Sequence, residues 1–259
     1  MELNLKDRVA VVTGGSKGIG LATAELLAAE GARVVVGSRT VTDELAALRD
    51  VHAVQVDLAT PAGPETLVSA AVERHGGVDL LVNNVAHSEP AESVTSFTDE
   101  QWQRIFELNL FAAVRMVRVA VPAMLGRDGA AIVNVSSLNA RRPDAPIAPY
   151  SASKAAMTNL AKALSRDLAP QGIRVNTVSP GPVRTPLWTA PGGFASVIAP
   201  GVPTDEVMDR VLPEAMGMVT GRITEPAEVA GLIAFLASPR AANVTGADVV
   251  IDGGMNLTV

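Results

Sequence analysis

The chain alternates short apolar runs rich in β-branched residues with longer Ala- and Leu-rich stretches, and this alternation constrains its fold more than any other feature. The runs expected to form strands are residues 9–12, 33–36, 53–56, 80–82, 132–135, 173–178 and 249–251. The stretches expected to form helices are residues 19–30, 65–75, 100–124, 150–168 and 226–236. Continuously apolar strands separated by helices are typical of a parallel sheet that is covered on both faces. We therefore expect a single α/β domain over residues 1–259, with a doubly wound, seven-stranded parallel sheet.

Residues 186–222 interrupt this alternation. Six of the first sixteen positions of the segment are Pro or Gly, and Trp188, Phe194, Met216 and Met218 lie among them or shortly after. A long loop within a compact domain is usually a lid or a binding loop, and apolar side chains on such a loop need something to cover. We expect a substrate-binding lid here; a disordered surface insertion is the alternative.

Composition excludes several classes of function. The chain has no cysteine, and its three histidines are not spaced as metal ligands, so disulfides, thiolate nucleophiles and a metal site are not expected. A formal net charge of −6 without a long basic run argues against nucleic acid and anionic membranes as partners. The first eight residues carry charges where a signal peptide needs an apolar stretch, and the longest apolar run near the end, residues 229–237, is far shorter than a membrane span. We expect a cytoplasmic protein.

A glycine-rich turn follows the first expected strand. The segment Thr13-Gly14-Gly15-Ser16-Lys17-Gly18-Ile19-Gly20 joins that strand to a helix. Glycines allow the backbone to turn sharply and to approach a pyrophosphate, which the free N–H groups and the positive dipole end of a helix N-terminus then bind. The turn predicts a dinucleotide site, although a purely structural glycine turn is the alternative.

The end of the second strand bears on the choice of nucleotide. An NAD site needs an acidic residue here to accept hydrogen bonds from the ribose 2′-hydroxyl, but the chain has Ser38 and Arg39 instead. Arg39, together with Lys17 in the glycine turn, suits a 2′-phosphate. The sequence therefore favours NADP(H), unless Arg39 is merely a solvated loop residue.

Tyr150 is the only tyrosine, and Lys154 follows it by four positions in a helical stretch, so both side chains lie on one face. Such a pair suits proton transfer to an alkoxide, because a nearby ammonium lowers the pKa of a phenol toward the working range. Ser137 comes just after an expected strand, where it could donate to a substrate oxygen. A packed Tyr with a solvated Lys, and a serine that only forms a turn, are the structural alternatives.

With these residues in view, the chain resembles the short-chain dehydrogenase/reductase family over essentially its whole length. The resemblance rests on the T-G-x3-G-I-G turn, the Asn-Asn pair at 83–84, the Ser…Tyr-x3-Lys set, the Pro-Gly at 180–181 and the Asp-Gly-Gly at 252–254, which occur in the family's order. It implies a Rossmann-type fold and an oxidoreductase that interconverts a ketone or 3-oxoacyl carbonyl and a secondary alcohol by hydride transfer.

The resemblance also implies residue roles. Tyr150 would be the acid/base, Ser137 the donor to the carbonyl oxygen, Lys154 the group that lowers the phenol pKa and holds the nicotinamide ribose, and Asn109 the holder of a water in a relay to the lysine. The implied cofactor contacts are Gly14, Ser16, Lys17, Gly18, Ile19, Gly20, Ser38, Arg39, Asp57, Leu58, Asn83, Tyr150, Lys154, Pro180, Gly181, Val183 and Thr185. Family members are commonly tetramers or dimers, so a homo-oligomer is expected, with helices 100–124 and 150–168 and the last strand at the interface.

One departure concerns the Asn-Asn pair, which the family usually continues as Ala-Gly and this chain continues as Val85-Ala86. Loss of the glycine puts the local backbone in doubt, and His87 nearby becomes a candidate substrate contact or a plain surface residue.

Two other functions remain open: a non-catalytic NADP(H)-binding protein, and a reductase acting on 3-oxoacyl groups linked to a carrier protein. Arg127, Arg141 and Arg142 could dock an acidic carrier, but Gln171 stands where such enzymes often have Arg. The apolar lid suggests an uncharged ketone, whereas Arg141, Arg142 and Arg184 leave an acidic substrate open.

Overall fold

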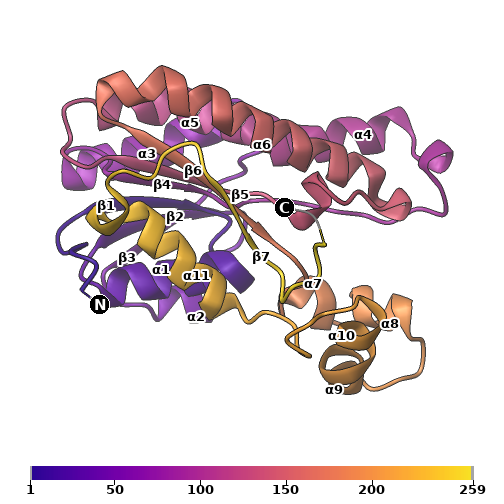
Figure 1. Ribbon diagram of the computed structural model, residues 1–259. Coiled ribbons are helices and arrows are strands. Elements are labelled where there is room, and N and C mark those ends of the chain that lie inside the picture. Colours follow the sequence, from indigo (N-terminus) through magenta and orange to yellow (C-terminus); the bar gives the residue numbers. More distant parts are fainter. Residues whose placement is uncertain (1, 258–259) are drawn as a thin grey trace.

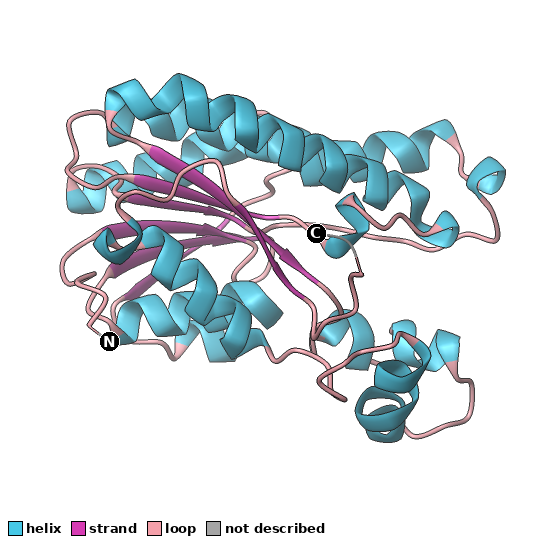
Figure 2. Ribbon diagram, viewed as in Figure 1, coloured by secondary structure: helices cyan, strands magenta, loops and turns pink. Residues whose placement is uncertain are grey.

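The computed structural model describes residues 2–257 and is built around a seven-stranded sheet (Figures 1 and 2). All neighbouring strands pair in parallel, in the order β3-β2-β1-β4-β5-β6-β7. The strands are β1 (Val9–Thr13), β2 (Arg33–Ser38), β3 (Val51–Gln55), β4 (Leu80–Asn83), β5 (Ala131–Val135), β6 (Arg174–Pro180) and β7 (Asp248–Ile251). The predicted doubly wound parallel sheet is confirmed.

Helices cover both faces of this sheet (Figure 1). The helices are α1 (Gly18–Ala29), α2 (Asp43–Ala46), α3 (Ala62–His75), α4 (Asp99–Phe106), α5 (Ala112–Met124), α6 (Ala148–Leu168), α7 (Pro186–Thr189), α8 (Phe194–Ile198), α9 (Thr204–Glu206), α10 (Leu212–Ala215) and α11 (Pro226–Ala237). Helices α1 and α11 pack on one face, and α3, α5 and α6 pack on the other. The predicted helix over 100–124 is divided, because a π-helical turn, Glu107–Phe111, separates α4 from α5.

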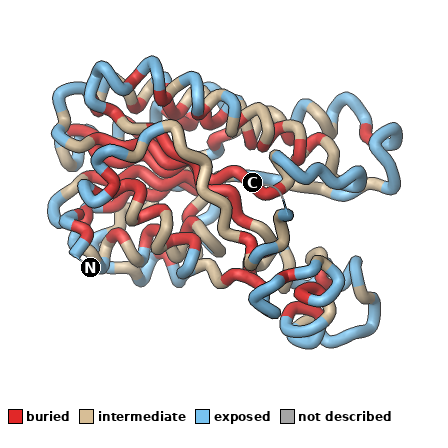
Figure 3. The backbone as a smooth tube through the Cα atoms, in the orientation of Figure 1, coloured by how far each residue is buried: buried red, intermediate tan, exposed pale blue. Residues whose placement is uncertain are grey.

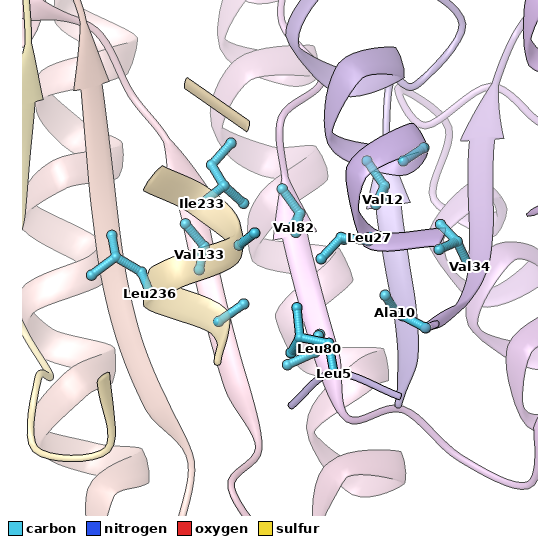
Figure 4. Packing of buried hydrophobic residues seen from close by; sticks show 14 of the residues in the cluster. Leu5, Ala10, Val12, Leu27, Val34, Leu80, Val82, Val133, Ile233 and Leu236 are labelled. Carbon is cyan, nitrogen blue, oxygen red and sulfur yellow. The ribbon is translucent and has the colours of Figure 1, made fainter. Parts of the chain in front are cut away.

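Two apolar clusters, one on each face of the sheet, hold these layers together, and the five inner strands between them are largely buried, whereas the edge strands β3 and β7 are half-buried (Figure 3). On the face of α1 and α11, Leu27 and Ile233 pack with Val12, Val82 and Val133 of the central strands (Figure 4). Each fully buried Val, Leu or Ile stabilises the fold by about 1.5–3 kcal/mol. Because both faces of the strands are buried, their sequences are continuously apolar rather than alternating.

The strand order reverses between β1 and β4. From β1 the chain builds outward through β2 and β3, and it then crosses over to place β4, β5, β6 and β7 on the other side. Ligands of open parallel sheets bind outside the carboxyl ends of the strands at such a reversal. The loops after β1 and β4 therefore bound the expected nucleotide crevice.

The segment 186–222, expected as a loop, contains four short helices, α7 to α10, and a second π-helical turn, Val207–Val211. It projects beyond the end of β6 (Figure 1) and has a small apolar cluster of its own, which includes Met208, Leu212 and Met218. None of these helices exceeds five residues. Helices this short leave no readable periodicity in a sequence punctuated by Pro and Gly.

None of the helices within residues 2–257 combines the length and the apolar character that crossing a membrane requires.

Candidate active site

The glycine turn after β1 is locked to the loop after β4. Asn84 Nδ2 donates to the carbonyl oxygens of Thr13 (2.9 Å) and Gly14 (3.1 Å), and Thr13 Oγ1 accepts from the N–H groups of Asn84 (2.9 Å) and Val85 (3.1 Å). Gly14 has a φ of +70°, and a Cβ at Gly20 would overlap the Gly14 carbonyl and lie 2.5 Å from Asn84 Nδ2. Thr13 and Asn84 thus hold the turn. Both residues belong to motifs noted in the sequence, but neither was assigned this role, because it depends on contacts between loops about 70 positions apart.

The N-terminus of α1, which follows the turn, is open to an anion. Its N-cap, Lys17, makes no side-chain capping bond, and no acidic residue lies in the first turn. Unsatisfied N–H groups and the positive dipole end remain available there. The Thr185 hydroxyl has no hydrogen-bond partner within residues 2–257, and a Cβ at Gly18 would lie 3.1 Å from Thr185 Cγ2. The turn and the segment after β6 therefore face each other across the crevice, and both fit a phosphate group.

The two cations proposed for a 2′-phosphate are free. The side chains of Lys17 and Arg39 are exposed and form no hydrogen bond or ion pair with any other described residue. Thr42 Oγ1 donates to Ser16 O at 3.0 Å, which ties the loop after β2 to the glycine turn. Ser38, unlike Lys17 and Arg39, is buried. Its hydroxyl donates to Thr40 O at 2.8 Å and so forms a hydrogen bond within the loop after β2.

Other residues expected to contact the cofactor lie at the same edge of the sheet but differ in exposure and in the residues that they contact. Asp57 is exposed after β3 and accepts from Ala59 N at 3.0 Å, and Leu58 beside it is buried. Val183 forms a parallel bridge with Thr224, and Gly181 packs against Asp252. Ile19 and Pro180 lie at the start of α1 and the end of β6.

Asn83 points into the sheet rather than into the crevice. The residue is 2% exposed, and its Nδ2 donates to Asn134 Oδ1 of β5 at 2.9 Å. Its side chain thus joins two central strands. A cofactor contact by Asn83 stays a prediction, and it would have to involve the main chain.

Ser137, Tyr150 and Lys154 lie together where β5 meets α6. Lys154 is 1% exposed, its Nζ donates to Val135 O at 2.8 Å, and that nitrogen lies 5.7 Å from the centroid of the Tyr150 ring. Ser137 lies close enough to Tyr150 to act on the pKa of its phenol, and the Ser137 Oγ accepts from Asn139 N at 3.1 Å and donates to Asn139 Oδ1 at 3.3 Å. The local spacing on one helix and the end of one strand explain why these three groups meet.

Burial shifts the pKa values of both Tyr150 and Lys154. Burial lowers the pKa of Lys154 to about 7 and raises the pKa of Tyr150, while the hydrogen bond with Ser137 opposes part of the rise. Burial thus opposes the expected lowering of the phenol pKa by Lys154, because desolvation disfavours both charged forms. Tyr150 is a neutral phenol at pH 7, the state from which a proton can be donated.

Asn109 lies in the π-helical turn between α4 and α5 and is fully buried. Its Oδ1 accepts from His87 N (2.7 Å), and its Nδ2 donates to His87 O (2.9 Å) and Ser153 Oγ (3.0 Å). Ser153 Oγ in turn donates to Tyr150 O at 2.7 Å. The amide of Asn109 is thus occupied by protein groups and joins the loop after β4 to the helix that carries Tyr150.

Replacement of the family's glycine by Ala86 causes no backbone strain, since Ala86 is not among the residues with positive φ. Its neighbour His87 is exposed, with its main chain held by Asn109. A substrate contact by the His87 side chain remains a prediction.

The arginines considered for an acidic substrate or carrier are all engaged. Arg141 pairs with Asp248 (2.8 Å), and Arg142 donates to Met255 O (3.2 Å). Arg184 pairs with Asp209 and with Glu225 (2.9 Å). Arg127 pairs with Asp79 (3.2 Å), which precedes β4 and so lies at the opposite end of the sheet from the site.

Comparison with known proteins identifies relatives over nearly the whole chain. A protein-family model described as enoyl-(acyl carrier protein) reductase matches residues 14–256. Dehydrogenase/reductase SDR family member 4 of Sus scrofa is 36% identical, with 96% of this chain and 88% of the relative covered. The 3-oxoacyl-[acyl-carrier-protein] reductase FabG of Vibrio cholerae is 33% identical, with 98% and 99% covered. The crystal structure of L-sorbose reductase from Gluconobacter frateurii complexed with NADPH and L-sorbose matches with a TM-score of 0.92 and 35% identity, and covers both chains completely.

Proposed function

The chain belongs to the short-chain dehydrogenase/reductase family and is an oxidoreductase, and from that premise we propose that it reduces a free, uncharged ketone to a secondary alcohol with NADPH. The observation that carries the proposal is the meeting of Ser137, Tyr150 and Lys154 beside a crevice whose helix N-terminus is open to phosphate. A non-catalytic nucleotide-binding protein would not need this set.

The residues around the crevice fit NADP(H). The uncapped start of α1 and the Thr185 hydroxyl would hold the pyrophosphate, and the unpaired Lys17 and Arg39 would hold the 2′-phosphate. When bound, the nicotinamide supplies the hydride. L-sorbose reductase, a relative of known structure, binds NADPH.

Exchange of Arg39 tests this cofactor preference. Arg39→Asp removes a phosphate donor and adds an acceptor for a ribose 2′-hydroxyl, so the ratio of kcat/KM for NADPH to that for NADH should fall by about 100-fold or more. Arg49→Asp, an exposed arginine on the loop before β3, makes the same charge change and should leave the ratio unchanged. An unchanged ratio in Arg39→Asp would mean that the 2′-phosphate is held elsewhere.

The catalytic groups then have distinct tasks. Ser137 would orient the substrate carbonyl oxygen, and Tyr150, kept protonated by burial, would donate its proton to that oxygen. Lys154 uses one Nζ proton on Val135 O, which leaves two for the ribose hydroxyls. Asn109 would hold the loop after β4 in a fixed position relative to the turn of α6 that carries Tyr150.

A free ketone is preferred to a carrier-linked substrate because, of the three candidate docking arginines, Arg127 and Arg141 are paired with carboxylates and Arg142 donates to a main-chain carbonyl. Residues 186–222 would cover the substrate as a lid, with the apolar side chains of α7 and α8 facing it. The test compares NADPH consumption with free ketones and with a 3-oxoacyl group on acyl carrier protein. We expect turnover of free ketones and no gain from the carrier, whereas a carrier-dependent rise in kcat/KM that is lost at high salt would favour the alternative.

We also propose that the protein is a homodimer or homotetramer that uses α4, α5, α6 and the edge strand β7. Phe111 and Leu125 on this side are 46% and 50% exposed, and large apolar side chains in such positions mark interfaces. Light scattering should give two or four times the chain mass; a monomer would contradict the proposal.

A further inference from the structure

Two hydroxyl groups lie beneath the turn of α6 that carries Lys154. Ser136 is 3% exposed, and its N–H donates to Val178 O of β6 at 2.8 Å, so its main chain is held in the sheet. Its Oγ lies 3.1 Å from Lys154 O and 2.7 Å from Thr158 Oγ1. We propose that Ser136 and Thr158 are positioning residues, which set the place of Lys154 relative to Tyr150 and the nucleotide. The inference rests on the proposed function.

The proton positions follow from the number of donors. Ser136 has a single hydroxyl proton, and that proton is directed to Lys154 O. The short contact between the two hydroxyls then requires Thr158 to donate to Ser136 Oγ. Lys154 O, which accepts from its own helix as well, therefore receives a second donor from the sheet. The Thr158 hydroxyl orients Ser136, and Ser136 anchors the Lys154 turn.

Three consecutive residues hold α6 in this way. Val135 O accepts from Lys154 Nζ, Ser136 Oγ donates to Lys154 O, and Ser137 reaches Tyr150. Lys154 is thus held both at its main-chain carbonyl and at the Nζ atom of its side chain. If its main chain shifted outward, Nζ could not keep Val135 O and also present its other protons to a ribose, and misplacement by about 1 Å can cost about 100-fold in rate.

The experiment uses a matched pair of variants at one position. Thr158→Val keeps the shape of the side chain and removes the hydroxyl, whereas Thr158→Ser keeps the hydroxyl and removes the methyl. Ser136→Ala removes the anchor itself. Ser165→Ala is the control, because Ser165 is a buried serine on the same helix whose Oγ donates to Lys162 O at 2.8 Å, away from the site.

We expect Thr158→Val and Ser136→Ala to lower kcat for ketone reduction about tenfold, with the ketone KM changed less than twofold. In alcohol oxidation, the pH profile should move to higher pH, because a Lys154 displaced outward is less buried and its pKa, which burial lowers to about 7, rises toward its ordinary value. Thr158→Ser and Ser165→Ala should keep the wild-type kcat and pH profile.

The outcomes separate the two claims. Absence of ketone turnover by the wild type would overturn the proposed function and the positioning role together. Wild-type turnover with an unchanged kcat and pH profile in Thr158→Val and Ser136→Ala would overturn the positioning role alone. Equal losses in Thr158→Val, Thr158→Ser and Ser165→Ala would also overturn it, since only general packing would then matter.

Discussion

Lys154 is a buried lysine with no acidic partner among the described residues. Its Nζ donates to Val135 O, and it lies over one edge of the Tyr150 ring. An unpaired buried cation is costly for a fold, and side chains with strongly shifted pKa values gather at functional sites. Its placement is therefore better explained by what it does for Tyr150 and the nucleotide than by stability.

Because burying a charged Lys154 is unfavourable, the free energy of unfolding should depend on pH. The pKa of Lys154 is about 7 in the folded protein against 10.5 as its ordinary value. The lysine therefore destabilises the fold fully below pH 7, and the penalty disappears as the pH rises toward 10.5. Lys154→Met should be more stable than the wild type near pH 7, and its advantage should shrink by up to about 1.4 kcal/mol per pH unit above that.

Urea unfolding of both proteins between pH 7 and pH 10 measures this difference. The control is Lys162→Met, an exposed lysine on the same helix whose Nζ donates to Gly246 O. A pH-independent difference between Lys154→Met and the wild type would mean that Lys154 keeps its proton in the folded protein.

Residues that local spacing brings together could be predicted, whereas side-chain partners from distant parts of the chain could not. Tyr150 and Lys154 meet because they are one helical turn apart. The side chain of Asn83, a residue expected to line the cofactor, bonds to Asn134, 51 positions away, and this contact was not predicted. No pattern within the sequence indicates which partner lies on the neighbouring strand.

At the level of elements, buried strands and long helices were predictable, whereas irregular turns were not. The π-helical turn at Glu107–Phe111 inserts into a stretch with ordinary helical periodicity, so the sequence predicted one helix. It places Asn109 where its amide can bond His87 and Ser153. Such turns often occur at functional sites.

The glycine turn supplies a prediction at this scale. A Cβ at Gly20 would meet the Gly14 carbonyl and the Asn84 amide, so Gly20→Ala should displace the turn, weaken NADPH binding at least tenfold and lower Tm. Gly231→Ala in α11 is the matched control. Nothing lies within 4 Å of a Cβ there, so it should raise the free energy of unfolding by about 0.5–1 kcal/mol. Fluorescence titration with NADPH and thermal melts measure both effects; wild-type affinity in Gly20→Ala would contradict the assignment of the turn.

On the scale of the whole molecule, Arg184 joins three parts. It follows Val183 in the segment after β6, and it pairs with Asp209 of the 186–222 segment and with Glu225 at the start of α11. This arginine therefore connects the proposed lid to the body of the protein beside the proposed nicotinamide position.

Weakening the contacts of Arg184 with the 186–222 segment should change the KM for the ketone more than the dissociation constant of NADPH. Asp209→Asn removes one partner of Arg184, so the ketone KM should rise about threefold to tenfold while the dissociation constant of NADPH stays within twofold. Asp205→Asn is the control, because Asp205 lies 3.8 Å from Arg184, is 92% exposed and should contribute almost nothing. A larger effect of Asp209→Asn on NADPH binding than on the ketone KM would show that the segment is not a substrate lid.

The central claim is that the Tyr150 phenol passes its proton to the oxygen of the reduced carbonyl. Its most direct test is the turnover number of Tyr150→Phe for ketone reduction, measured beside its NADPH dissociation constant. We expect a fall in kcat of about 100-fold or more with NADPH binding unchanged within twofold, since only the proton donor is lost. Turnover within a few-fold of the wild type would contradict it.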